Sequence, residues 1–234
     1  MSRSETIEAV SAVFCYQDQI FYVVRQNHLD VFPGYHSFPG GKIEVMDQNS
    51  GIDTFFPKIN PVHISTLCRE MKEELNFDLK SAFSEGHLTS IEPLAEIFAP
   101  PFAQIRFRNW IYRIDLKNPE KFILEKGEFS EGTWCSPQTL LKTFLKGRSL
   151  MVPPLRKMLR KLTENPHQKQ MGDLSIHYDE SKEIPELEML KGVRVLMIPS
   201  LTLPPAERTN AFRLGDPDSP QILVDPSPGS EETY

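Results

Sequence analysis

The strongest hydrophobic pattern in the chain lies between residues 61 and 75, where apolar side chains recur at intervals of three and four. This spacing predicts an amphipathic α-helix that begins near Pro61 or Val62 and buries one face against a sheet. The apolar stripe consists of Ile64, Leu67, Met71 and Leu75.

The opposite face of this helix carries Glu70, Glu73 and Glu74, which are neighbours at spacings of three and four residues. Like charges at these spacings destabilise a helix by roughly 0.2–0.5 kcal/mol per pair, so a cation is expected over the cluster. Carboxylates without an accompanying Cys or His favour Mg²⁺ or Mn²⁺ over zinc. Gly40 and Gly41 precede the helix, and a backbone without Cβ atoms can approach a metal ion or a phosphate closely. A solvated acidic face is the alternative interpretation.

Alternation of apolar and polar residues predicts several β-strands. Residues 9–16 and 20–25 are expected to form a hairpin, and Pro33 and Gly34 a later turn. Further strands are predicted at 94–99, 104–115, 121–124, 192–198, 209–214 and 221–224. Helices are predicted at 136–145 and from Pro153 onward, the second with an apolar stripe of Leu155, Met158, Leu159 and Leu162.

On the strand at 104–115, Arg106, Arg108, Trp110 and Tyr112 share one face. Two arginines beside two aromatic rings can hold a phosphate and stack on a base. A solvent-facing sheet surface or a contact in a homodimer explains the same pattern equally well.

Composition restricts the class of protein. The chain of 234 residues is 39% hydrophobic and 25% charged, which suits one good core with an appendage. A net charge of −6 provides no electrostatic footprint for duplex nucleic acid or an anionic membrane. No signal peptide or long apolar run is recognisable, so a cytoplasmic location is expected. Cys15, Cys68 and Cys135 lack C-x-x-C spacing and are expected to be reduced.

Residues 41–47 and 69–77 resemble the signature of the Nudix hydrolases, G-x5-E-x7-R-E-U-x-E-E-x-G-U, in which U is aliphatic. Asp47 replaces the first Glu of this pattern but keeps a carboxylate. Asn76 replaces Gly, and Asn also suits the left-handed conformation that ends a helix. The resemblance implies an α+β fold, namely a Nudix α/β/α sandwich with a mixed sheet.

The spacer inside this signature is longer than the family pattern. It holds 21 residues, 48–68, in place of seven, which is an insertion of 14. Gly51, Phe55, Phe56 and Pro57 predict a surface excursion that ends where the helix begins, and such loops are thermodynamically tolerable. The insertion either contacts substrate or is a neutral elaboration.

The resemblance also implies an activity, the Mg²⁺-dependent hydrolysis of a nucleoside diphosphate linked to another group, with Mn²⁺ as a possible substitute. Glu70, Glu73 and Glu74, with a backbone carbonyl of Gly40 or Gly41, would hold the cations that neutralise the diphosphate and acidify the attacking water. The small-molecule substrate would be of the coenzyme A, ADP-ribose or nucleotide-sugar type.

Other site residues follow from the resemblance. Arg69 would brace the loop by pairing with Glu44 or with a helix carboxylate. In the family, a glutamate of a later loop often acts as general base or as a further metal ligand, and Glu128 and Glu131 are the candidates here. Two ordinary exposed glutamates are the alternative.

The segment before Gly40 is similar to the upstream pattern of coenzyme A pyrophosphatases. Arg25, Gly34 and residues 38–41 (FPGG) fall at matching positions, which makes Arg25 a candidate substrate contact together with Arg106, Arg108 and Trp110. Gln26 and Asp30 replace a small residue and an arginine of that pattern. Asp30 therefore reverses a charge that would meet phosphate.

The chain is expected to divide into a Nudix domain at 1–163, a polar linker at 164–173 and a β-rich segment at 174–234. The last segment resembles the beginning of a metallo-β-lactamase-like domain, but it lacks the H-x-H-x-D-H metal motif. The six histidines are scattered along the chain. The segment is therefore expected to be a truncated domain that pairs with its own Nudix domain or with a second chain, or is partly disordered.

Two other classes of function stay open. The first is a non-catalytic Nudix-like protein that binds a nucleotide and regulates a partner, although such a protein has no need of three metal carboxylates. The second is a two-domain protein in which the C-terminal segment provides the main role.

Overall fold

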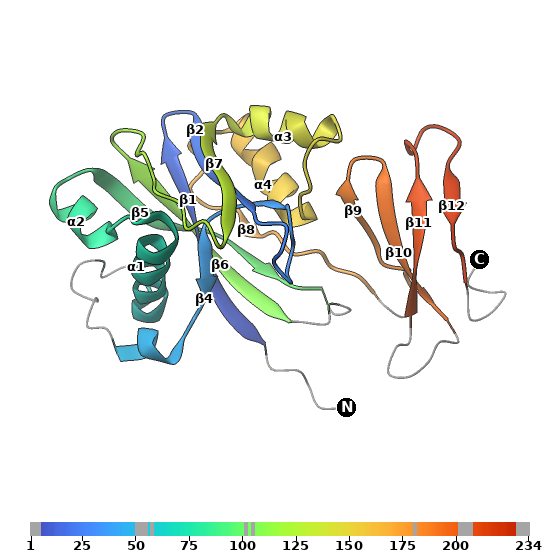
Figure 1. Cartoon of the computed structure of the whole chain (residues 1–234), viewed down its shortest axis with the longest axis horizontal. Coiled ribbons are helices and arrows are strands. Elements are labelled where there is room, and N and C mark those ends of the chain that lie inside the picture. The colour runs from blue at the N-terminus through green and yellow to red at the C-terminus, as the bar shows by residue number, and fades with distance from the viewer. Residues whose placement is uncertain are drawn as a thin grey trace. The chain divides into compact units, whose positions relative to one another are not determined.

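The computed structural model describes residues 6–49, 56, 59–100, 103, 106–179, 182–200 and 208–227 (Figure 1). The chain divides into two compact units. The first consists of Met1–Leu141 with Pro154–Ile176, and the second of Lys142–Pro153 with His177–Tyr234. None of the helices in the described part of the chain is both long and apolar enough to span a membrane.

The first unit is built on a mixed sheet with the strand order β3-β2-β1-β6-β5-β8, to which β4 is added on β1 and β7 on β2. The β1–β6 and β5–β8 pairs are parallel and the other pairs are antiparallel. The strands are β1 (Ile7–Tyr16), β2 (Gln19–Arg25), β3 (His36–Ser37), β4 (Gly40–Lys42), β5 (Leu88–Phe98), β6 (Phe107–Leu116), β7 (Phe129–Cys135) and β8 (Gly172–Asp173).

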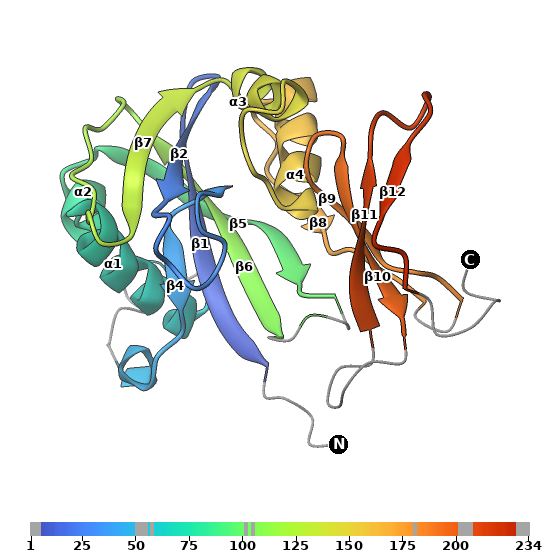
Figure 2. The same ribbon diagram turned by 45° about the vertical axis from the view of Figure 1, so that its right-hand side comes forward.

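The helices are α1 (Pro61–Leu75), α2 (Leu79–Ser84), α3 (Pro137–Leu145) and α4 (Pro153–Glu164), with a short 3-10 helix, η1, at Val45–Asn49. Figure 2 shows α1 and α2 on one side of the sheet and α4 on the other. This arrangement is the α/β/α sandwich with a mixed sheet that the sequence predicts.

Helix α1 begins and ends as the sequence predicts, because each terminus is capped by an asparagine. The Asn60 side chain accepts hydrogen bonds from the backbone N–H groups of Val62 and His63, and Pro61 occupies the first turn. Asn76 adopts a left-handed conformation with φ of 50°, and its N–H donates to the Met71 carbonyl. These caps fix the length of the helix and hence which carboxylates it presents.

The predicted core is confirmed on both faces of the sheet. The apolar stripe of α1 is almost completely shielded from solvent, and so are the predicted residues of α4. Aromatic rings extend the α1 side of the core: Phe122 packs against Phe14, Phe21, Phe77 and Trp134, with ring centroids 4.6–6.0 Å apart.

Two predicted features of the first unit are wrong. Residues 121–124 do not form a strand, because this segment bonds to the end of α1 and not to a strand: Ile123 N–H donates to the Leu75 carbonyl. The insertion is not wholly a surface excursion, because Phe56 is buried and packs against Phe83 at a tilt, with 4.8 Å between ring centroids. Gly51, Phe55 and Pro57 lie outside the described residues.

The other predicted strands are found with small shifts of their ends. The hairpin pairs Cys15 with Ile20 and Tyr16 with Gln19. Strand 94–99 corresponds to β5, which starts earlier, and strand 104–115 corresponds to β6, although residues 104–105 lie outside the described part.

The segment at 164–173, predicted as a linker, contributes to the sheet of the first unit. Its last residues form β8, which pairs with Ala95 and Glu96 of β5. The buried Arg113 side chain donates to the Pro166 carbonyl at 2.6 Å, which holds the segment near α4. The first compact unit accordingly continues to Ile176.

The second unit contains an antiparallel sheet in the order β12-β11-β10-β9. Its strands are β9 (Glu186–Leu190), β10 (Val193–Pro199), β11 (Arg208–Leu214) and β12 (Ile222–Val224), with Leu196, Ile198 and Ala211 in its small core. The last three strands match the predicted runs. Strand β9 was not predicted, because Glu186 and Glu188 interrupt its apolar character.

Candidate active site

The glycines of β4 lie directly against the carboxylates of α1. Gly41 faces Glu70 so closely that a Cβ atom at residue 41 would collide with the Glu70 carboxylate. Gly40 has a φ of 142°, and its N–H donates to Glu74 Oε2 at 2.7 Å. The sequence predicts a Gly40 or Gly41 carbonyl turned towards a cation, whereas the structure shows the Gly40 N–H turned towards a carboxylate. Gly40 requires glycine, because its φ is positive and a Cβ would collide with the backbone of Val10 and Ser11, whereas a Cβ at Gly41 would displace the Glu70 carboxylate.

Arg69 is the cation at the centre of the site. Its guanidinium lies 2.9 Å from Asp47 Oδ2, 2.8 Å from Glu70 Oε1 and 3.2 Å from Glu73 Oε2, and it also donates to the Lys42 carbonyl at 2.9 Å. The predicted pairing with a helix carboxylate is therefore present.

The predicted pairing of Arg69 with Glu44 is not found, because Asp47 takes that place. The Glu44 N–H donates to Asp47 Oδ2 at 2.8 Å, and the Thr66 hydroxyl donates to the same oxygen at 3.0 Å. Although burial alone would raise the pKa of Asp47, hydrogen bonds from Arg69, Glu44 and Thr66 hold it below its ordinary value. Asp47 thus stays charged and fixes Arg69.

The remaining carboxylates have too little positive charge around them. Burial raises the pKa of Glu74 to about 9, and the nearby Glu70 carboxylate contributes, while the Gly40 N–H opposes the shift. Burial also raises the pKa of Glu70, although Arg69 counteracts it. Without a cation, Glu74 is therefore protonated at neutral pH, and a bound divalent cation would favour its ionised form.

The structure separates the two candidate glutamates of the β7 region. Burial is the largest cause of the raised pKa of Glu70 and of Glu74, and the charge of Glu128 adds to both shifts, so Glu128 lies in the neighbourhood of these two carboxylates. Glu131 acts instead on Tyr22 and His36 and is directly opposite Val24 in the β2–β7 pair. Of the two, Glu128 is therefore the candidate nearer to the carboxylates of α1.

Arg25 lies at the same site. It is the last residue of β2 and pairs with Phe129, the residue next to Glu128, and its charge opposes the rise that burial causes in the pKa of Glu74. Its Nε donates to the Val31 carbonyl at 3.0 Å, which fixes the guanidinium in one orientation.

The other predicted substrate residues lie near the beginning of α1. Arg108 forms an ion pair with Glu96 at 2.5 Å and stacks over the Trp110 ring, with 4.1 Å from Cζ to the ring centroid. Trp110 packs against His63 at 5.1 Å between centroids, and its Nε1 is buried without a partner in the described structure. The Arg106 carbonyl accepts the Ile7 N–H.

The donor set fits a hard divalent cation, since it consists of carboxylate oxygens only. Within the described residues, no three His, Cys, Asp or Glu side chains are already grouped as metal ligands. Arg69 contacts Glu70 and Glu73, and the Glu73 side chain is 60% exposed, so that it can leave Arg69 for a cation. Glu70, Glu73 and Glu74 are the residues that would hold Mg²⁺ or Mn²⁺.

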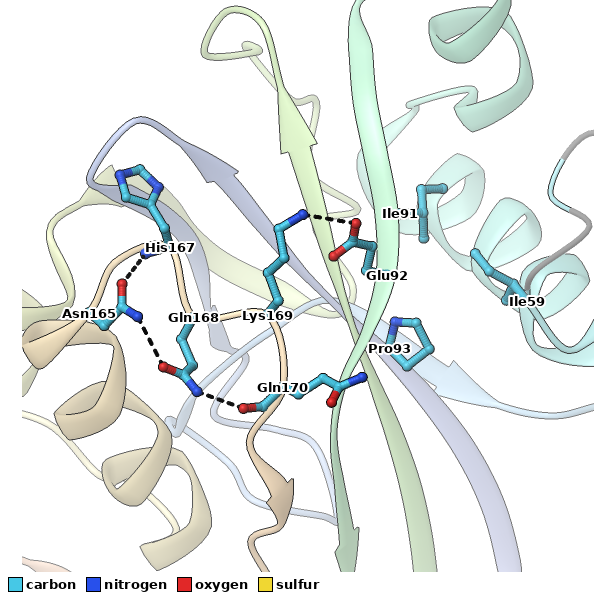
Figure 3. A pocket seen from close by; sticks show the side chains of 9 residues that line it. All are labelled: Ile59, Ile91, Glu92, Pro93, Asn165, His167, Gln168, Lys169 and Gln170. Carbon is cyan, nitrogen blue, oxygen red and sulfur yellow. Dashed lines mark hydrogen bonds and ion pairs between the residues drawn. The ribbon is translucent and has the colours of Figure 1, made fainter.

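A hollow elsewhere in the first unit does not belong to this site (Figure 3). It lies between β5 and the segment after α4, and its polar side chains bond to one another or to nearby backbone: Lys169 pairs with Glu92 at 3.1 Å and Asn165 donates to Gln168 at 3.1 Å. None of Glu70, Glu73, Glu74 and Glu128 lines it, and its one carboxylate, Glu92, is paired with Lys169.

Comparison with solved structures identifies the fold. A NUDIX hydrolase from Alicyclobacillus acidocaldarius superposes with a TM-score of 0.58 at 17% sequence identity, covering 70% of this chain and 94% of that one. The NUDIX domain of Shewanella oneidensis NrtR, complexed with ADP ribose, covers 70% of this chain and 90% of its own at 16% identity and a TM-score of 0.49. No protein-family model and no curated protein sequence matches. The chain therefore contains the Nudix fold.

Proposed function

We propose that this protein is a Mg²⁺- or Mn²⁺-dependent Nudix pyrophosphohydrolase that cleaves the diphosphate of a nucleoside diphosphate derivative. The observation that carries the proposal is the convergence of Glu70, Glu74 and Glu128 beside Gly40 and Gly41 with too little positive charge to balance them. Buried carboxylates with strongly shifted pKa values mark functional sites more often than structural ones.

Each residue has a distinct role in this proposal. Glu70, Glu73 and Glu74 hold the cation, which supplies charge neutralisation at the diphosphate and a more acidic water. Glu128 accepts the proton of that water at its carboxylate as the water attacks phosphorus. Arg69 keeps the loop after β4 against α1 through Asp47. Two phosphorylated products leave, and no covalent intermediate forms.

Arg25 is our choice for the contact with phosphate, because its guanidinium is already oriented beside Glu74. Arg108 and Trp110 stay candidates for the group on the far side of the diphosphate, as does Arg106. To bind an anion, Arg108 would have to leave Glu96. Coenzyme A, ADP-ribose and nucleotide sugars are the substrates to compare.

The experiment incubates the full chain with each of these compounds in the presence of Mg²⁺, Mn²⁺ or a chelator, and identifies the products by mass spectrometry. Cleavage of at least one compound into two phosphorylated products, abolished by the chelator, is expected. Glu73→Gln should lower kcat about 100-fold or more without unfolding the protein. Tight binding of a nucleotide without any cleavage would favour the regulatory alternative.

A second comparison tests the choice between the two loop glutamates. Glu128→Gln should lower kcat about 100-fold, since general-base catalysis contributes roughly 10²–10⁴. Glu131→Gln should stay within about twofold of the wild type. The reverse order of the two effects would contradict the assignment of Glu128.

A further inference from the structure

Glu128 lies at the end of a tight turn that is bonded to α1. The Glu125 N–H donates to the Glu74 carbonyl at 2.8 Å. The Glu128 and Phe129 N–H groups donate to the Glu125 carbonyl at 3.1 and 2.9 Å. The backbone of Glu125 is thus shared by the helix that carries Glu74 and the turn that carries Glu128.

The side chain of Glu125 closes this turn from one side. Its Oε1 accepts the Gly127 N–H at 2.9 Å, so the carboxylate satisfies a backbone donor between Glu125 and Glu128. This is a local hydrogen bond at an exposed position and is not part of the core.

Gln26 closes the turn from the other side. Its Nε2 donates to the Lys126 carbonyl at 2.8 Å and to the Phe129 carbonyl at 3.4 Å. Its backbone N–H donates to the Glu128 carbonyl at 2.8 Å. A single residue after β2 therefore bonds to the turn on both sides of Glu128.

The segment that leads into the turn is fixed independently of both side chains. Phe122 packs in the aromatic core, with 4.6 Å between its ring centroid and that of Phe21. Trp134 Nε1 donates to the Glu120 carbonyl at 2.9 Å. Loss of the Gln26 or Glu125 side chain should therefore loosen the turn and leave the fold intact.

We propose that Gln26 and Glu125 are positioning residues that hold the Glu128 carboxylate towards Glu70 and Glu74. The inference rests on the proposed function, because it assigns Glu128 a place in the reaction. A proton acceptor must lie within hydrogen-bond reach of its water, and a displacement of about 1 Å can cost on the order of 100-fold in rate.

The test uses one variant that breaks each contact and one that keeps it. Gln26→Met keeps the length of the side chain and removes its donor, and Glu125→Ala removes the acceptor for Gly127. Both should lower kcat about 10-fold with KM within about twofold. Glu125→Gln keeps an acceptor oxygen and should restore kcat to within about threefold of wild type. Lys121→Ala, at an exposed position of the same segment, is the matched control.

Hydrogen exchange in the metal-free protein supplies a measurement that does not depend on activity. The amides of Gly127, Glu128 and Phe129 should exchange about 10-fold faster in Gln26→Met and Glu125→Ala, and at the wild-type rate in Glu125→Gln. Unchanged exchange in the first two variants would contradict the proposal that Gln26 and Glu125 hold the turn that carries Glu128.

A double-mutant comparison shows whether both side chains act through Glu128. In the Glu128→Gln background, Gln26→Met and Glu125→Ala should cause no further loss of kcat. Fully additive losses would overturn the inference. Wild-type turnover by Glu128→Gln, with Glu73→Gln inactive, would remove this inference and leave the hydrolase proposal standing. A wild-type protein that cleaves none of the compounds would remove both.

Discussion

The charged side chains near the two ends of α1 differ in how fully they are paired. Near its beginning, Arg108 is matched by Glu96 and Glu8 and stacks over Trp110. Near its end, Arg69 is shared among Asp47, Glu70 and Glu73, and the buried Glu74 accepts a hydrogen bond from the Gly40 N–H. In the first region one arginine has two carboxylate partners, whereas in the second region three carboxylates share Arg69.

The two regions differ in how their charges are compensated. A folded chain ordinarily pairs its buried charges, because an unpaired buried charge is costly. Arg108 follows this rule, because Glu96 and Glu8 pair with it. Among the carboxylates of α1, Glu70 is paired with Arg69, whereas Glu74 avoids an unpaired charge by keeping its proton, and a divalent cation would favour its ionised form. The charges near the beginning of α1 are therefore paired within the protein, whereas a cation would be needed to ionise Glu74 near its end.

The largest expected effect is on catalysis and comes from Glu74, near the end of α1. Glu74→Gln removes a cation ligand while keeping the hydrogen bond from the Gly40 N–H, because the amide oxygen also accepts. It should lower kcat about 1,000-fold with an unchanged circular dichroism spectrum. Turnover within tenfold of the wild type would contradict the proposed functional difference between the regions near the beginning and the end of α1.

Arg69→Leu should have the next largest effect. It leaves the buried Asp47 without its ion-pair partner, and breaking such a pair typically costs about 3–5 kcal/mol. We expect the free energy of unfolding in urea to fall by about 3 kcal/mol. Arg69→Lys, the matched control, keeps the charge but not the fork of donors, and it should recover part of the loss.

The pH dependence of stability sharpens the comparison. In the metal-free folded state Glu74 keeps its proton up to about pH 9, whereas in the unfolded chain it loses it near 4.5. Between these values the folded state binds more protons, so its stability falls as the pH rises, by at most about 1.4 kcal/mol per pH unit. The contribution is complete below about pH 4.5 and is lost as the pH passes about 9. Glu74→Gln should remove this slope in denaturant titrations, and an unchanged slope would contradict the assigned pKa.

The smallest effect is expected near the beginning of α1, where Arg108 is already paired with carboxylates. Arg108→Met keeps an apolar contact with Trp110 and removes a partly exposed ion pair, which is worth about 1 kcal/mol or less. KM should change less than twofold if the cluster is only structural. A tenfold rise in KM with constant kcat would instead establish Arg108 as a substrate contact.

Local sequence signals predicted much of this molecule. Helix α1 is bounded by its own asparagine caps and marked by its own apolar stripe, so that both its limits and its buried face could be predicted. The strands with clear alternation were found for the same reason. The segment at 121–124 could not be assigned, because its β-like composition serves ring packing around Phe122 and hydrogen bonds to the end of α1.

The site was predictable only as far as its residues share one element. The carboxylates of α1 follow from helical spacing, but the choice of Glu128 over Glu131 depends on how β7 pairs with β2. Asp47 replaced Glu44 as the partner of Arg69 because η1 turns the chain back towards α1. Gln26 and Glu125 belong to no sequence motif. Their contacts with the turn depend on the tertiary arrangement of β2 and α1, so the sequence alone did not predict them.

The most direct test of the central claim is the free energy of unfolding as a function of Mg²⁺ or Mn²⁺ concentration, for the wild type and for Glu74→Gln. A cation that binds the folded state stabilises it by RT ln(1 + [L]/Kd), so wild-type stability should rise steadily with metal. Glu74→Gln should be more stable than the wild type without metal near neutral pH and should gain little on its addition. A wild-type protein that is indifferent to both metals, or a variant that gains as much, would contradict the claim that these carboxylates await a cation.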